Sequence, residues 1–273
     1  MSHDIRTPMN AILGMTVIAE SSLQNTEKVK DCLSKISLSG AHLLELINEV
    51  LDMSKIESGK MSLSEEVIHL DKLVGEVAQI IRPEAENRKQ KYEAQIRGLE
   101  HGTVCGDAVR IKQILINLLS NAVKYTPVGG RIGLSLDEKL SSESGVGCFE
   151  FTVEDNGIGM APEFIDRLFM PFERAEDPRV SRIQGTGLGL AITRNLVSMM
   201  NGTIQVESRM DVGTKFVVTI YLKLAGDGET FRPEPPIDAF PVKKQFKPGF
   251  RVLLAEEVGG QAVLGRQVPQ STP

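Results

Sequence analysis

The stretch Cys148–Met160 (CFEFTVEDNGIGM) joins an apolar strand pattern to a glycine-rich turn. Apolar and polar residues alternate with a period of two, which places Phe149, Phe151 and Val153 on one face of a strand that packs on a core. Asp155 has the same phase, so it faces this core where the strand ends. A buried carboxylate is costly without a partner. The stretch therefore predicts a binding site centred on Asp155.

The two glycines after Asp155, Gly157 and Gly159, allow more than one interpretation. A dinucleotide-type phosphate loop is one, but an aspartate directly ahead of the glycines would repel a phosphate. An acceptor for the amino group of a base fits this order better. Taken alone, the stretch also fits an ordinary glycine-rich turn with a solvated acid.

A long helix is predicted upstream, from Asp107 to Tyr125. Its apolar positions are Ile111, Ile114, Leu115, Leu118, Leu119 and Ala122. Asn117, Asn121 and Lys124 recur at i, i+4 and i+7 and share another face of the helix. Amide oxygens suit Mg²⁺, which takes hard oxygen ligands and keeps phosphate oxygens in its shell. Plain solvated helix surface is the alternative for this stripe.

A second glycine-rich stretch, Gly185–Leu190 (GTGLGL), precedes a predicted helix from Leu188 to Met200. Backbone N–H groups at such a helix start bind anionic phosphates. The pattern is weak by itself. It gains specificity because it follows both earlier motifs and a long irregular segment, 156–186, of the kind that usually has a function.

The N-terminal stretch Ser2–Asn10 (SHDIRTPMN) places His3, Asp4 and Thr7 at the edge of an amphipathic helix predicted from about residue 3 to 24. A second helix follows the turn at 24–27 and ends at Ser58–Lys60. Both helices carry apolar residues in the alternating four-three spacing of helical bundles. One hairpin cannot bury both apolar stripes, so dimerisation into a four-helix bundle is expected. Packing on the neighbouring domain of the same chain is the alternative.

Composition excludes several classes of function. The net charge of −5, with both signs interspersed, argues against a nucleic-acid partner. Cys32, Cys105 and Cys148 have no CxxC spacing, which indicates neither a disulfide framework nor a zinc site and favours a cytoplasmic location. No apolar run is long enough to span a bilayer and the start lacks a signal-peptide pattern, so no membrane contact is expected within this segment. A membrane anchor of the parent protein would lie outside it.

The order of the motifs resembles that of sensor histidine kinases. Ser2–Asn10 resembles their H box, and four further stretches resemble the N, G1, F and G2 boxes: Asn117–Pro127 (NLLSNAVKYTP), Asp155–Met160 (DNGIGM), Phe169–Phe172 (FMPF) and Gly185–Leu190 (GTGLGL). The resemblance covers about residues 1–224. It implies an α+β fold: a helical hairpin, half of a dimeric four-helix bundle, followed by a Bergerat-type α/β sandwich whose mixed sheet has helices on one face.

The resemblance also implies a domain organisation. Residues 1–60 would form the dimerisation and phosphoacceptor hairpin, and residues 61–224 the catalytic ATP-binding domain. Residues 225–249, which hold five of the thirteen prolines, read as a linker. Residues 250–273 would be the truncated start of a receiver domain, because Phe250–Glu257 resembles its first strand and acidic pair. The parent would then be a hybrid kinase.

Site roles follow from the resemblance at the matching positions. In the hairpin, His3 would be the phosphoacceptor, Asp4 would take or orient its proton, and Thr7 would orient a water for dephosphorylation of a receiver. ATP and Mg²⁺ would be bound by the second domain, with Asn121 as the metal ligand. The residues expected around the nucleotide are Asn117, Asn121, Lys124, Tyr125, Asp155, Gly157, Gly159, Gly185, Thr186, Gly187, Leu188, Gly189 and Thr214.

The implied function is an ATP-dependent protein histidine kinase that phosphorylates His3 and passes the phosphoryl group to an aspartate of a receiver domain, with receiver phosphatase as a second activity. One alternative is an ATP-binding dimerisation module without autokinase activity, since His3 lies so near the start. A third reading is an ATPase of the topoisomerase, chaperone or mismatch-repair kind. It is disfavoured because Asn117 stands where a catalytic carboxylate would be wanted.

Overall fold

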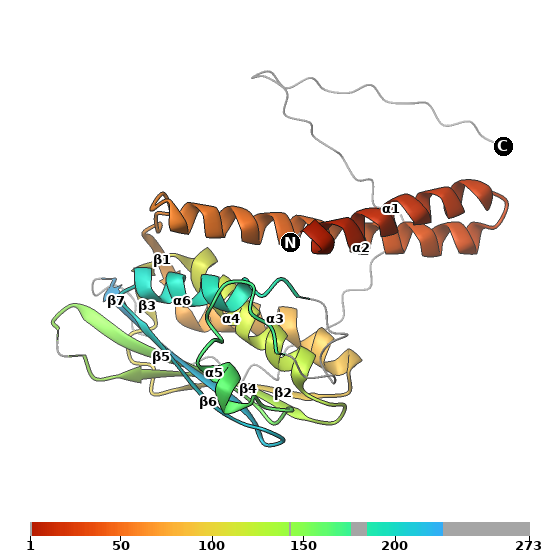
Figure 1. The fold of residues 1–273 in the computed structure, drawn as a ribbon. Helices are drawn as coiled ribbons and strands as arrows, with labels where there is room; N and C mark the ends of the chain where they lie inside the picture. Colours follow the sequence, from red (N-terminus) through yellow and green to blue (C-terminus); the bar gives the residue numbers. More distant parts are fainter. Residues whose placement is uncertain (1, 142, 176–184, 226–273) are drawn as a thin grey trace, which may run out of the picture. The chain divides into compact units, whose positions relative to one another are not determined.

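The computed structural model describes residues 2–141, 143–175 and 185–225, and of Ser2 and His3 only the backbone. The segments predicted as a linker and as the start of a receiver domain lie outside the described residues, apart from Ala225. Two long helices come first, α1 (Ser2–Ser21) and α2 (Thr26–Glu57), and an α/β domain follows (Figure 1). None of the described helices is both long and apolar enough to cross a membrane.

The α1–α2 hairpin has the predicted turn and the predicted end. The side chain of Asn25 caps α2 by accepting a hydrogen bond from the backbone N–H of Lys28. Ser58 follows the last turn, where its N–H donates to the carbonyl oxygen of Ser54 over 3.1 Å. Pro8 lies inside α1 without ending it.

Many apolar side chains of the hairpin stay exposed in the single chain. In α2 only Cys32 and Leu46 are buried. The large exposed side chains of the two helices and their turn are Met9, Leu13, Val17, Ile18, Leu23, Leu33, Leu38, Leu44, Ile47 and Leu51. Contact between α1 and α2 therefore leaves a broad apolar surface, the condition under which helical hairpins pair into bundles.

The second part of the chain is built on a seven-stranded mixed sheet. Its strands are β1 (Glu66–His69), β2 (Lys91–Arg97), β3 (Thr103–Gly106), β4 (Arg131–Lys139), β5 (Val146–Asp155), β6 (Thr203–Arg209) and β7 (Gly213–Leu224). The order is β1-β3-β7-β5-β4-β2, and β6 also pairs with β7. β2 and β4 run parallel, whereas the other paired strands are antiparallel.

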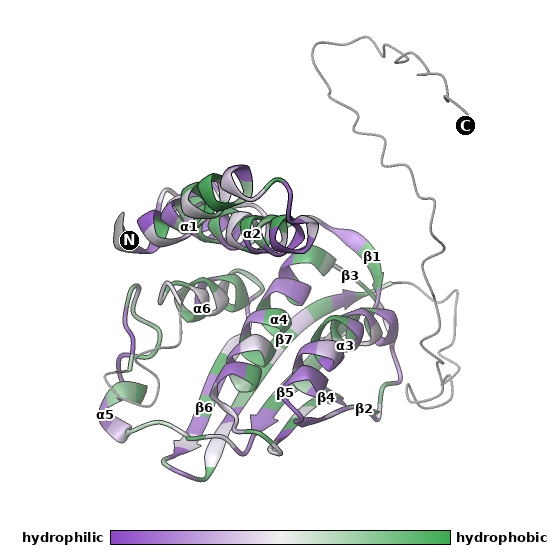
Figure 2. Ribbon diagram, turned by 90° about the vertical axis from the view of Figure 1, so that its right-hand side faces the viewer, coloured by the Kyte–Doolittle hydropathy of each residue, from purple (hydrophilic) through white to green (hydrophobic). Residues whose placement is uncertain are grey.

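Helices cover one face of this sheet. They are α3 (Leu70–Asn87), α4 (Ala108–Tyr125) and α6 (Gly189–Met199), and the single-turn helix α5 (Pro162–Ile165) lies apart from them (Figure 2). Phe149 and Phe151 of β5 are fully buried in the core beneath these helices, as their alternation predicts. The predicted α/β sandwich with helices on one face is confirmed.

Two local features differ from the sequence-based expectation. A break in the helix near Pro83 is expected, but α3 continues through Pro83 to Asn87. A proline removes one backbone donor, and burial of Ile81 and Ala85 on either side keeps the helix together. The sequence pattern also does not predict β3, whose four residues are too few to show a period. Pairing with β1 and with the end of β7 defines it.

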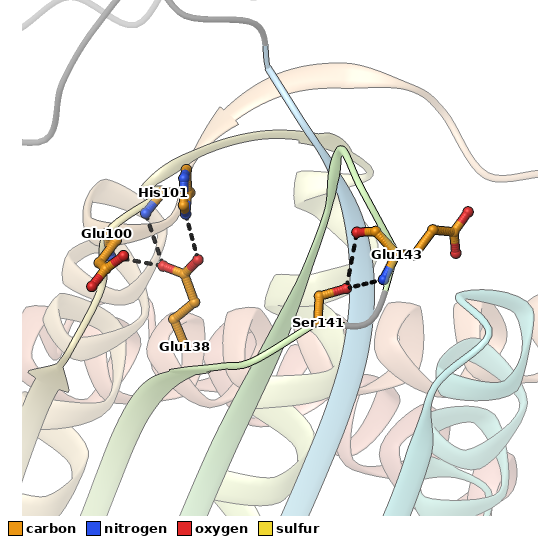
Figure 3. Close-up of polar contacts among 5 residues, drawn as sticks. All are labelled: Glu100, His101, Glu138, Ser141 and Glu143. Atoms are coloured by element: carbon orange, nitrogen blue, oxygen red, sulfur yellow. Dashed lines mark hydrogen bonds and ion pairs between the residues drawn. The ribbon is translucent and has the colours of Figure 1, made fainter.

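The hydrogen-bonding partner of His101 comes from a distant strand (Figure 3). The Oε2 atom of Glu138 accepts hydrogen bonds from the backbone N–H groups of Glu100 at 2.7 Å and His101 at 2.8 Å. Its Oε1 atom lies 2.6 Å from Nδ1 of His101. Partial burial works to raise the pKa of Glu138, but these hydrogen bonds outweigh it and lower that pKa. The cluster fastens the β2–β3 loop to the end of β4.

The start of α4 is held by a single carboxylate. Asp107 caps the helix by accepting from the N–H of Arg110 at 3.0 Å, and its second oxygen accepts from the N–H of Ser64 at 3.0 Å. Partial burial works to raise the pKa of Asp107, but these hydrogen bonds outweigh it and lower that pKa. Asp107 therefore joins the segment after α2 to the first turn of α4.

We expect Asp107→Ala to lower the free energy of unfolding by about 1–2 kcal/mol at neutral pH, since a helix cap is lost. Urea unfolding of the domain measures this. Because the pKa of Asp107 is lowered by folding, its contribution is present above the ordinary pKa and is lost as pH falls through the folded-state value. The difference in the free energy of unfolding between the wild type and Asp107→Ala should therefore become smaller at acidic pH. Asp107→Asn is the control: it keeps one oxygen for the N–H of Arg110 but cannot also accept from the N–H of Ser64, so it should cost less than Asp107→Ala.

Candidate functional site

A cavity of about 1420 Å³ opens where α4, β5, β7 and the start of α6 come together beside the hairpin. Most residues predicted for the site line it. They are Thr7 from α1 and Asn117, Asn121, Lys124, Tyr125, Asp155, Gly159, Gly185, Thr186, Gly187, Gly189 and Thr214 from the second part of the chain. Residues as far apart in the sequence as Thr7 and Thr214 are thus brought to one surface.

Four predicted site residues are not among those lining this cavity. Gly157 is buried beneath it, and the side chain of Leu188 belongs to the core. Asp4 lines a small neighbouring cavity, together with Thr186 and Leu188. The side chain of His3 lies outside the described residues, although its backbone belongs to α1.

Asp155 ends β5 with its carboxylate directed into the large cavity. Burial raises its pKa to about 6, although the N–H groups of Gly157 and Thr214 donate to it and favour the charged form. The bond from Gly157 measures 2.8 Å. Asp155 is thus a poorly hydrated acceptor whose remaining hydrogen-bonding capacity faces the cavity.

The turn after Asp155 requires glycine for steric reasons. A Cβ atom on Gly157 would lie 2.6 Å from the carbonyl oxygen of Tyr125. Gly159 has a φ of +63°, and a Cβ there would clash with the carbonyl group of Arg209. The N–H of Ile158 donates to the carbonyl oxygen of Tyr125 over 3.2 Å. These close approaches hold the turn between the end of α4 and the end of β6.

A pair of hydroxyl groups lies next to Asp155, and Thr214 of this pair lines the cavity. Thr214 is buried opposite Asp155 in the sheet, and its Oγ1 lies 2.9 Å from Oγ of Ser208. Ser208 also accepts from the N–H of Met160 at 2.9 Å. Thr214 therefore faces the core as its phase on β7 predicts. The sequence analysis missed Ser208, although it shares a phase with the half-buried Ile204 and Val206 on β6.

The polar stripe of α4 forms one wall. Asn117, Asn121 and Lys124 all line the cavity, so their predicted common face is confirmed. The Nδ2 atom of Asn117 donates to Oγ1 of Thr193 in α6 over 2.7 Å. Its Oδ1 atom lies against Gly189, where an added Cβ would clash with it. Thr193 is a site residue that the sequence analysis missed.

Amide oxygens, rather than a cluster of acids, are the donors available for a cation here. Within the described ranges, no group of three or more His, Cys, Asp or Glu side chains is arranged to hold a metal ion. Asn121 lines the cavity. Such oxygens fit Mg²⁺ when the rest of its shell comes from water and from phosphate oxygens of a bound substrate.

The Gly185–Leu190 segment is held from two sides. The N–H of Phe172 donates to the carbonyl oxygen of Gly187 over 2.9 Å, and Gly187 has a φ of +73° with its Cα packed against the backbone of Phe172. Oγ1 of Thr186 accepts from the N–H of Leu188 at 3.1 Å. The same hydroxyl donates a short hydrogen bond to Oε2 of Glu49 in α2.

Glu49 is a further residue that sequence reasoning missed. Burial raises the pKa of its carboxyl group, against the opposing effect of the Thr186 hydroxyl. It lines the same cavity as Lys124 and Thr186. No local pattern marks Glu49, because its partner is 137 positions away.

We expect Asp155→Asn to stabilise the unliganded protein above about pH 6. Folding raises the pKa of Asp155 from 3.8 to about 6, so the folded state holds this proton more tightly and wild-type stability falls as pH rises through that window. The uncharged amide of the variant avoids the cost of ionising this buried carboxyl group, which is about 2–3 kcal/mol in free energy of unfolding. Urea unfolding of both proteins across this range measures it. Equal pH dependence of the two would contradict the assignment, and Glu207→Gln, which removes an exposed carboxylate on β6, is the control.

Comparison with known proteins agrees with this geometry. The family described as "Histidine kinase-, DNA gyrase B-, and HSP90-like ATPase" matches residues 106–225, and the "His Kinase A (phospho-acceptor) domain" family matches residues 1–59. The chain is 36% identical over 259 residues to the autoinducer 2 sensor kinase/phosphatase LuxQ of Vibrio harveyi, which covers 94% of this chain and 30% of LuxQ. The chain thus spans about 30% of the length of this curated relative.

Solved structures give the same assignment. Full-length ShkA in complex with AMPPNP superposes with a TM-score of 0.63 and 30% identity, covering 82% of this chain and 45% of ShkA. The Acinetobacter baumannii histidine kinase AdeS gives a TM-score of 0.56 and 25% identity over 81% of this chain and 98% of AdeS. With a phospho-acceptor domain followed by an ATPase domain of this kind, the chain belongs to the sensor histidine kinase family.

Proposed function

We propose that this chain is an ATP-dependent protein histidine kinase of a two-component phosphorelay, which phosphorylates itself on His3. The observation that carries the proposal is the composition of the large cavity. It joins Asp155, the Asn121 stripe and the Gly185–Leu190 segment to Thr7, one helical turn from His3 on α1. A nucleotide site and a phosphoacceptor helix thus border the same space.

The base of ATP is proposed to bind at Asp155. A carboxylate that keeps accepting capacity after its bond from Gly157 suits the exocyclic amino group of adenine. With a pKa of about 6, Asp155 is mostly ionised at neutral pH and can accept in this way. Thr214, whose hydroxyl contacts that of Ser208, and Tyr125 line the same cavity as Asp155.

The phosphates are proposed to lie between α4 and the start of α6. Backbone N–H groups at a glycine-rich helix start favour anions, and the positive charge of Lys124 faces the same space. In the described structure the N–H of Leu188 is occupied by Oγ1 of Thr186. Phosphate binding would therefore require this short-range bond to open. ShkA, whose structure is similar to that of this chain, was solved in complex with AMPPNP, an ATP analogue, which supports nucleotide binding by this chain.

Asn121, with Asn117 beside it, is proposed to hold Mg²⁺ together with phosphate oxygens. The carboxamide oxygens of these two side chains are ligands of the kind that Mg²⁺ takes. The metal would supply charge neutralisation for the triphosphate and for the group in transfer. Lys124 contributes to the same electrostatic stabilisation from the last turn of α4.

The chemical step is an in-line displacement at the γ-phosphorus. A neutral imidazole nitrogen of His3 forms the new N–P bond, the bond to the β-phosphate oxygen breaks, and ADP leaves. An ordinary histidine pKa of about 6.5 leaves the ring mostly neutral at physiological pH. Asp4 is proposed to orient the ring and to receive the proton that the imidazole loses.

A receiver domain and a second copy of this chain are the proposed protein partners. Phosphoryl transfer from His3 would go to an aspartate of the receiver. Thr7 would orient a water for the reverse, phosphatase reaction, which is in keeping with the kinase/phosphatase name of LuxQ. The second copy would cover the exposed apolar side chains of the hairpin, among them Leu13, Val17 and Leu44.

We expect the chain, incubated with γ-labelled ATP and Mg²⁺, to acquire a label that is stable in alkali and labile in acid, as phosphohistidine is. His3→Gln should lose the label and keep its affinity for a fluorescent ATP analogue, because the nucleotide site lies in the second domain. Asp155→Asn should lose analogue binding as well. Label that survives His3→Gln would refute the assignment of the phosphoacceptor, and binding without any label in the wild type would leave an ATP-binding module.

We expect Asn121→Ala to weaken binding of the ATP analogue at least about tenfold in the presence of Mg²⁺. The affinity measured in EDTA should stay close to that of the wild type, because the lost group acts through the metal. Isothermal titration with and without Mg²⁺ separates the two cases. Equal losses in both conditions would show that Asn121 contacts the nucleotide itself.

A further inference from the structure

The polar stripe of α4 extends beyond the nucleotide site. Arg110 and Gln113 precede Asn117 and Asn121 on this helix, at spacings of three, four and four residues, so the four side chains follow one face. Asn117 and Asn121 line the large cavity, whereas Arg110 and Gln113 do not. One face of α4 therefore carries two different polar functions.

Arg110 and Gln113 bind α2 through Asp52. Nη1 of Arg110 and Nε2 of Gln113 each donate to Oδ2 of Asp52 over 2.9 Å. Nη1 of Arg110 also donates to Oε1 of Gln113 over 2.7 Å, which closes a three-residue network. The Asp52 and Arg110 side chains are only 13% and 22% exposed. A half-buried carboxylate with two donors is held more firmly than a surface pair.

Two neighbouring contacts strengthen the same junction. Asp107, which caps α4, accepts from the backbone of Ser64 in the segment after α2. Glu49 lies about one helical turn before Asp52 on α2 and accepts from Thr186 of the glycine-rich segment. The hairpin thus holds both walls of the phosphate end of the cavity, α4 through Asp52 and the α6 side through Glu49.

The junction lies at the phosphoacceptor end of the hairpin. Asp4, the residue after His3, lines a small cavity with Leu46 and Val50 of α2. Val50 precedes Asp52 by two positions, so the start of α1 and the Asp52 network are at a similar level along α2. From Arg110 to Asn121 the helix rises about 16 Å at 1.5 Å per residue. The rigid helix α4 thus sets the distance between Asp52 and the proposed metal ligand.

We propose that Asp52 is a positioning residue for phosphoryl transfer. By holding Arg110 and Gln113 it sets the position of α4, and with it the proposed phosphate site, relative to the start of α1. This rests on the proposed kinase function. Asp52 makes no contact with the nucleotide cavity, so it should affect the transfer step and leave ATP binding alone.

The chain offers a matched control for this test. Asp31 lies on the same helix, far along α2 from Asp52, and forms an exposed pair with Lys35 of α2 over 2.7 Å. In the full chain, Asp52→Ala should lower the rate of His3 labelling at saturating ATP at least about tenfold, since small displacements of reacting groups are costly. The dissociation constant of the ATP analogue should not change. Asp31→Ala should match the wild type in both measurements.

A charge exchange separates positioning from general damage. Asp52→Arg combined with Arg110→Asp restores an ion pair with the opposite polarity and should recover most of the labelling rate lost in Asp52→Ala. Failure of the exchange to raise the rate above that of Asp52→Ala would overturn the proposal. The proposal would also be overturned if Asp52→Ala labelled His3 at the wild-type rate, or if its labelling rate fell in proportion to a loss of ATP affinity.

A measurement without nucleotide distinguishes failure of this proposal from failure of the proposed function. Thermal unfolding of Asp52→Ala, Arg110→Ala and the double variant should show non-additive midpoints, with a coupling of about 2–4 °C. Additive midpoints would mean that the network does not join the two helices, and would overturn the proposal. If the midpoints of the variants are coupled but the wild-type chain takes up no label, the kinase function is refuted, and the positioning role with it.

Discussion

The structure depends on one helix, α4, whose different faces contact the core, the hairpin and the cavity. An α-helix repeats every 3.6 residues, so its faces can meet different surroundings only if the sequence keeps them in strict register. Ile111, Leu115, Leu118 and Leu119 are buried against the sheet, while the opposite stripe meets α2 at its start and the cavity further along. Core, hairpin contact and candidate site are thus fixed relative to one another by a single rigid element.

The candidate site adds a carboxylate whose environment disfavours its charge. Asp155 ends the central strand β5, where burial raises its pKa, and hydrogen bonds, chiefly from the backbone N–H groups of Gly157 and Thr214, offset part of that cost. Proteins keep such destabilised groups where a ligand needs an acceptor that water does not screen. The close approach of Gly157 and Gly159 to neighbouring carbonyl groups keeps the carboxylate in place.

The hairpin contributes to the same site from outside the sheet. Thr7 lines the large cavity and Glu49 holds Thr186, which in turn accepts the N–H of Leu188. The glycine-rich segment is therefore shared between its own domain, through Phe172, and α2, through Glu49. A change in the position of α2 would therefore alter the start of α6 directly through Glu49 and Thr186, without any rearrangement of the core.

The sequence by itself determined the strand and the inward phase of Asp155, the common face of Asn117, Asn121 and Lys124, and the order of motifs that identifies the family. These depend on periods of two and 3.6 residues, which are local properties of the chain. Only the tertiary structure decided the pairing of Asp52 with Arg110, of Glu49 with Thr186 and of Glu138 with His101, and the existence of β3. Those partners lie tens of residues or more apart, and a side chain's distant partner is set by how the elements pack, which no local period records.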